Sequence, residues 1–195
     1  QYVNPMIGTD FTGNTYPGAQ LPFGMVQLSP DNGLPGWDRI SGYFYPDTTI
    51  AGFSHTHLSG TGAGDLYDIS FMPVTRPYKE APAPLGIYST FSHNDEAASA
   101  GYYRVLLKDY NINVELTATE RCGIQRYTFP EAEASVFLNL KKAMNWDFTL
   151  DSKIEVVDST TIRGYRLSQG WSPLQHVYFE TRFSKPFVAC HMDTT

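Results

Sequence analysis

The sequence predicts an all-β protein, a large antiparallel β-sandwich. Ile112, Val114, Leu116 and Ala118 alternate with polar residues, a period of two that is typical of a strand with one buried face. Strand-like runs follow one another about every ten residues with turn signals between them, which favours a sandwich over βαβ units. The 195 residues include 13 Tyr and 12 Phe but only 17% charged residues, a composition that favours strands and argues against disorder.

The first hundred residues predict short strands separated by Gly- and Pro-rich loops. Residues 1–12 are expected to be irregular. The strands are expected at 23–28, 41–45, 50–54 and 66–72, followed by a Pro-rich surface connection at 76–86. One helical turn is expected within 89–100, where 94–98 have helical propensity but no apolar period.

From Gly101 onward the strand signals are stronger. Strands are expected at 103–107, 112–119, 123–129, 135–140, 153–157, 161–167 and 176–183. The apolar run 187–192 resembles a strand without a partner, so we expect the sandwich to be truncated before its last strands.

Composition also limits the function classes. The net charge of -6 argues against nucleic-acid binding, which needs a basic face, and no segment has the length and apolarity of a membrane span. The chain starts with Gln, so either a signal peptide has been removed or the sequence was trimmed. Cys122 and Cys190 are compatible with a disulfide or with two buried thiols.

Residues 55–65 form the most unusual segment, because they combine two imidazoles, three hydroxyls, a carboxylate and three glycines. This composition suits neither a helix nor a core strand. It predicts a polar loop between two strands, a usual place for binding groups. Together with the Gly- and Pro-rich block 13–24 and the turn 36–38, this central loop is expected to form one rim of a carbohydrate site.

The two imidazoles of the central loop allow three interpretations. His55 and His57 are two residues apart and would point to one face of a strand, where they could hold a metal ion with Asp65. Zinc sites usually have further His or Cys ligands at a typical spacing, which are missing here. The alternatives are contacts with a sugar, or hydrogen bonds that only stabilise the loop.

Tryptophans are the natural candidates for stacking on a sugar ring, because an indole offers an apolar face and a polar N–H group. Trp37 lies in a Pro-Gly-Trp-Asp turn and is favoured for this role over that of a core aromatic. Trp171 fits a site or a buried position equally, and Trp146 is interpreted as a surface or packing residue.

Glycoside hydrolysis with inversion uses two carboxyl groups on opposite faces of the sugar. Asp65 with Asp68, or Asp31 with Asp38, could be such a pair, but an Asp in a turn more often bonds the backbone. The glycines of the central loop lack the Lys-Ser/Thr ending and the following helix of a phosphate-binding loop, so nucleotide binding is not expected.

Several long segments resemble the N-terminal domain of glycoside hydrolase family 92, the calcium-dependent exo-acting α-mannosidases. The resemblance covers nearly the whole chain and is carried by segments 3–9, 15–19, 21–31, 36–38, 52–62, 115–119, 126–130, 170–171, 177–179 and 183–187.

This resemblance implies a galactose-mutarotase-like supersandwich followed by an (α/α)₆ barrel, with the active site between the two domains. It implies an enzyme that hydrolyses terminal α-mannosides, α-1,2-linked ones in particular, with inversion. A Glu would act as the general acid and an Asp as the general base. Both carboxylates and most Ca²⁺ contacts would belong to the helical domain, which this chain does not contain. This chain alone would then be inactive, and the enzyme would be secreted, periplasmic or on the cell surface.

Within this chain the resemblance and the loop composition assign sugar contacts to six residues and no metal ligand. The candidates are Tyr16, Gly18, Trp37, His55, Thr56 and His57. The expected partners are a mannose-containing glycan and the C-terminal helical domain. A stand-alone carbohydrate-binding module and a purely structural support domain are the alternatives.

Overall fold

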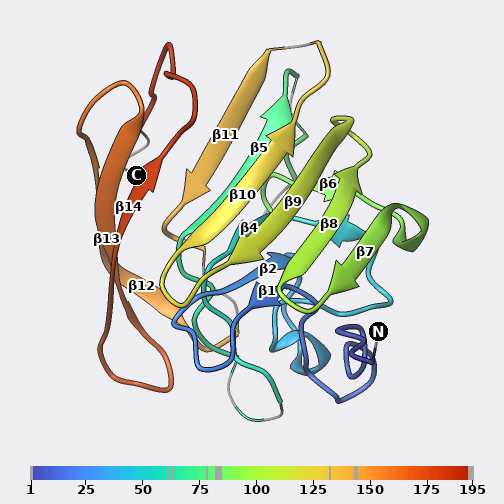
Figure 1. Cartoon of the computed structure of the whole chain (residues 1–195). Helices are drawn as coiled ribbons and strands as arrows, with labels where there is room; N and C mark the ends of the chain where they lie inside the picture. Colours follow the sequence, from blue (N-terminus) through green and yellow to red (C-terminus); the bar gives the residue numbers. More distant parts are fainter. Residues whose placement is uncertain are drawn as a thin grey trace.

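The computed structural model describes residues 2–60, 62, 64–77, 79–81, 85–131, 133–142 and 145–192. These residues form three layers of antiparallel sheet (Figure 1). A five-stranded sheet in the order β1-β2-β4-β5-β11 lies between a four-stranded sheet, β10-β9-β8-β7, and a three-stranded sheet, β12-β13-β14. The all-β sandwich expected from the sequence is confirmed.

The strands are short in the first half of the chain and longer in the second half. The first half contains β1 (Ala19–Gln20), β2 (Gln27–Asp31), β3 (Thr49–Ile50), β4 (Gly52–Ser54), β5 (Ser70–Thr75), β6 (Ser89–Thr90) and β7 (Glu96–Ser99), with 3₁₀ turns η1 (Trp37–Arg39) and η2 (His93–Asp95). The second half contains β8 (Tyr102–Leu107), β9 (Ile112–Ala118), β10 (Gly123–Thr128), β11 (Ala134–Asn139), β12 (Phe148–Val156), β13 (Thr161–Gln169) and β14 (Gln175–Arg182). Strands β3 and β6 pair only with each other.

The main core lies between the five-stranded and four-stranded sheets. The alternation at 112–118 sends Ile112, Val114 and Leu116 into this core, while the residues between them face outward. They pack against residues such as Leu28 of β2 and Phe53 of β4. The period-two prediction for this strand is therefore confirmed.

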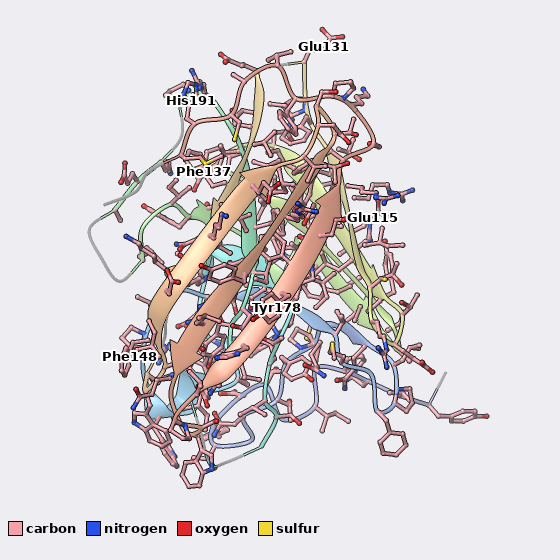
Figure 2. The ribbon with its side chains drawn as sticks, turned by 90° about the vertical axis from the view of Figure 1, so that its left-hand side faces the viewer. Glu115, Glu131, Phe137, Phe148, Tyr178 and His191 are labelled. Carbon is pink, nitrogen blue, oxygen red and sulfur yellow. The ribbon has the colours of Figure 1, made fainter. Side chains whose placement is uncertain are left out.

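A second, smaller core lies on the other face of the five-stranded sheet, below the three-stranded sheet. Phe71 belongs to this core, whereas Met72, its neighbour on β5, belongs to the main core. Because successive residues of a strand point to opposite faces, β5 is buried on both sides and reads as an apolar run. Figure 2 looks onto the outer face of the three-stranded sheet, where Tyr178 lies.

Some sequence expectations for the first half are wrong. Residues 66–69 are not part of a strand, because Leu66, Tyr67 and Ile69 have φ values of 80°, 65° and 56°. The expected strand at 23–28 starts only at Gln27, and residues 41–45 contain no strand. The helical turn expected near residue 94 is the short η2, and the residues after it form β7.

The end of the described chain also differs from expectation. The run 187–192 is not a strand; its Phe187 N–H group instead donates to the carbonyl of Ser159, and its ring packs on Phe183. Cys122 and Cys190 are both exposed and free, so neither the disulfide nor the buried-thiol alternative holds. Of the Pro-rich connection at 76–86, residues 78 and 82–84 lie outside the described residues, as do Thr61 and Ala63 of the central loop. Among the described helices, none is long and apolar enough to cross a membrane.

Candidate functional site

The central loop joins β4 to β5, and its two imidazoles point into the protein. The His57 ring is only 3% exposed; its Nδ1–H group donates to the Gln27 carbonyl at 2.7 Å, and its Nε2 lies 2.8 Å from Asp31 Oδ1. Asp31 is itself fully buried and pairs with Lys142 at 3.2 Å. All ring partners of His57 are internal, which corresponds to the loop-stabilising interpretation rather than to contact with a sugar.

His55 is held in a similar way. Its Nδ1–H group donates to the Ile69 carbonyl at 2.8 Å, and its ring packs edge-on against Phe71. Burial lowers the pKa of His55, although the hydrogen bond to Ile69 acts in the opposite direction. The His55 ring, held by Ile69 and Phe71, thus fixes the start of the loop.

Tyr16 and Gly18 also serve packing in this structure. The Tyr16 ring is buried 5.1 Å from the His57 ring, its hydroxyl donates to Gln20 Oε1 at 2.6 Å, and burial raises the pKa of Tyr16 to about 12. At Gly18 a Cβ atom would lie 2.2 Å from the Leu28 carbonyl oxygen, closer than any real contact. Gly18 is therefore needed for the close approach of β1 to β2.

Thr56 connects the loop to a buried charge cluster. Its hydroxyl donates to Asp68 Oδ2 at 2.7 Å and accepts from the Asp68 N–H group at 2.8 Å. The other oxygen of Asp68 pairs with Arg166 at 2.6 Å, and Arg166 also pairs with Asp147 at 2.5 Å. Burial raises the pKa of Asp147 even though the Arg166 charge opposes that shift.

Arg166 connects the layers. It is fully buried on β13, and its Nε–H group donates to the Leu140 carbonyl and to Thr149 Oγ1. The three-stranded sheet is thus fixed to the base of the central loop by one guanidinium. The sequence analysis missed Arg166; its only signal is an inward position on the predicted strand at 161–167.

Trp37 remains at the surface, as the sequence predicted. Its side chain in η1 is 49% exposed, and its ring lies 6.2 Å from that of Trp146, which is 48% exposed. The Gly36 N–H group donates to Asn145 Oδ1, and the Trp146 N–H group donates to the Gly64 carbonyl. The turn 36–38, the central loop and residues 145–146 therefore meet in one rim, and the sequence analysis missed the contribution of Trp146.

Three of the four carboxylates considered as acid–base pairs, Asp65, Asp68 and Asp31, are engaged in internal contacts. Asp65 accepts from the N–H groups of Leu66 and Trp171 and from Gln175 Nε2, and Asp68 and Asp31 are enclosed in the ion pairs described above. Among the described residues, no group of three or more His, Cys, Asp or Glu side chains is placed to hold a metal ion. The proposed use of Asp65 as a third ligand beside the two imidazoles therefore has no geometric support.

Comparison with known proteins identifies similar chains. The model of the glycosyl hydrolase family 92 N-terminal domain matches residues 2–194. A family GH92 α-mannosidase from Bacteroides thetaiotaomicron, BT3965, solved with mannoimidazole, is 44% identical with a TM-score of 0.90 over 96% of this chain and 25% of its own. A GH92 inverting mannosidase from the same organism, BT2199, is 29% identical with a TM-score of 0.77 over 96% of this chain and 25% of its own.

A curated relative is also described as a glycosidase. This protein, an uncharacterised secreted glycosidase of Arthroderma benhamiae, is 28% identical over 69% of this chain and 18% of its own length. This chain therefore spans about a quarter of the length of the solved relatives and less of the curated one.

Proposed function

The chain belongs to glycosyl hydrolase family 92 as its N-terminal domain, and from this premise we propose that it completes the sugar site of an exo-acting α-mannosidase. The enzyme would hydrolyse terminal α-mannosides of glycans, α-1,2-linked ones in particular, with inversion. The observation that carries this proposal is the pair of exposed indoles, Trp37 and Trp146, on a rim built from three separate loops.

Exposed indoles suit the binding of a sugar ring. Each offers an apolar surface for a pyranose face and an N–H group for a hydroxyl. The network beneath the rim, with Thr56, His55 and His57, holds the loops rigidly, so that little ordering is needed on binding. We therefore assign sugar contact to Trp37 and Trp146 and loop positioning to the other three.

The chemistry is proposed to come from the rest of the enzyme. Inversion needs an acid and a base whose carboxyl groups lie about 6.5–9.5 Å apart with room for a water molecule. In this chain Asp65, Asp68 and Asp31 are committed to internal partners, which supports a Glu acid and an Asp base in the helical domain.

Calcium is likewise proposed to bind outside this chain. Ca²⁺ takes about six to eight oxygen ligands, with Asp and Glu carboxylates prominent among them, and the described residues bring no three His, Cys, Asp or Glu side chains together to hold a metal ion. When bound, the ion would help to hold and distort the mannose. The description of the fungal relative as secreted supports a location outside the cytoplasm.

The test is hydrolysis by the full-length enzyme. We expect α-1,2-mannobiose to be cleaved, the first-formed mannose to be the β-anomer in proton NMR, and a chelator to abolish turnover until Ca²⁺ is restored. Cleavage of no α-mannoside would refute the proposal. Tight glycan binding by the isolated 195-residue chain would favour the alternative of a stand-alone binding module.

A further inference from the structure

A hollow lies beside the rim, between the central loop and the turn that joins β13 to β14. Its volume is about 530 Å³, within the range of about 300–1,000 Å³ for small-molecule sites. Its walls include the apolar side chains of Leu58, Leu66 and Val177. Thr56, Gln175 and His176 add polar groups to the lining.

Trp171 gives this hollow a binding surface. Its side chain is 78% exposed, although it lines the hollow, and its indole N–H group donates to no partner among the described residues. The hollow thus combines an apolar platform with one unused hydrogen-bond donor, the indole N–H group of Trp171.

The turn that carries Trp171 is anchored to the central loop. Asp65 is only 3% exposed, and its Oδ2 accepts from the backbone N–H group of Trp171 at 3.0 Å and from Gln175 Nε2 at 2.8 Å. Gly170 permits this approach, because a Cβ atom there would lie 2.1 Å from Asp65 Oδ1. A buried carboxylate therefore fixes the backbone of the turn that presents the exposed indole to the hollow.

The hollow continues from the rim. The Gly64 carbonyl accepts from the Trp146 N–H group, and the next residue, Asp65, holds Trp171. Consecutive Cα atoms are about 3.8 Å apart, so the Trp37–Trp146 pair and Trp171 flank the same short segment of the central loop. The ligand proposed below would stack on the rim and extend across this segment towards Trp171.

The charges select the kind of ligand. Asp65 and Asp68 line the hollow, and the only cation that pairs with either of them among the described residues, Arg166, is sealed below it, so an anion such as a phosphorylated sugar is disfavoured. We propose that the hollow is a distal subsite for a neutral sugar unit of the leaving group, beyond the unit that adjoins the scissile bond. This inference rests on the proposed function, and it makes Trp171 a specificity residue and Asp65 its positioning residue.

The test compares substrate lengths in the full-length enzyme. For Trp171→Ala we expect KM on a linear α-mannotetraose to rise about tenfold, the loss typical of one aromatic contact, with kcat nearly unchanged. On α-mannobiose and on an aryl α-mannoside neither constant should change. Trp171→Phe should restore most of the affinity for the tetrasaccharide.

Two further variants separate the subsite from general damage. Asp65→Ala, which keeps the indole but removes its anchor, should give the same length-dependent rise in KM with an unchanged kcat. Leu174→Ala removes an exposed apolar side chain from the same turn, outside the lining of the hollow, and should change nothing.

An equal loss on all three substrates, or no loss on the tetrasaccharide, would overturn the inference while leaving the α-mannosidase proposal intact. A wild-type enzyme that cleaves none of the three would instead refute the proposed function itself.

Discussion

The buried Arg166 offers the sharpest test of how the outer sheet is fixed to the central loop. In Arg166→Met the side-chain volume is nearly kept, but Asp68 and Asp147 lose their cation in a site without solvent. Breaking a buried ion pair by removing one partner costs about 3–5 kcal/mol. For a domain of this size about 1 kcal/mol shifts Tm by about 2–4 °C, so Tm should fall by about 6–20 °C.

Arg163 provides the matched control, because it lies on the same strand and pairs with Glu155 on the exposed face. Arg163→Met should cost less than about 1 kcal/mol, as surface ion pairs do. Both variants are measured by thermal and urea unfolding of the 195-residue chain. The Arg166→Met defect should shrink at acid pH, because the pKa of Asp147 is already raised and a protonated carboxyl needs no cation. Equal, small losses in the two variants would refute the reasoning.

Two further predictions concern stability. Gly18→Ala should destabilise the chain by about 2 kcal/mol or more, since its Cβ meets the Leu28 carbonyl; urea unfolding at an unchanged midpoint would contradict the packing role. Burial alone would raise the pKa of Asp31, but Lys142 and His57 lower it overall. Since this folded-state pKa is below the unfolded value of about 3.9, the stabilisation is present above that pH and is lost as pH falls through the folded pKa. Asp31→Asn should therefore weaken the acid dependence of unfolding as pH falls below the unfolded-state value, and an unchanged slope would contradict this assignment.

The second half of the fold was predictable because local pattern and tertiary structure agree there. Ile112 to Ala118 alternate so regularly that only one face can be buried, and the structure buries that face. At residues 66–69 the two disagree. Leu66 and Tyr67 have the side chains of a strand but adopt a left-handed backbone, held by the bond from the Tyr67 hydroxyl to the Ile40 carbonyl. A contact between residues so distant in sequence leaves no local signal.

The site divides in a similar way. The exposure of Trp37 could be predicted because its turn is flanked by Gly and Pro, and its side chain is exposed in the structure. The inward orientation of His57 could not be predicted, because its partner Asp31 lies on a different strand. The same holds for Trp146, whose pairing with Trp37 depends on the distant contact between Gly36 and Asn145. Loop composition predicted that the turn 36–38 and the central loop lie in one rim, but not which of their side chains face solvent.

The most direct test of the central claim, that this domain supplies a wall of the sugar site, is the activity of full-length Trp37→Ala on α-1,2-mannobiose. Losing one large apolar contact should cost about 1–3 kcal/mol, so kcat/KM should fall by about ten- to a hundredfold. The melting temperature should stay within about a degree of wild type, because the indole is half-exposed. Full activity combined with a lowered melting temperature would mean that Trp37 only packs against Trp146, and that this domain supports the enzyme without touching its substrate.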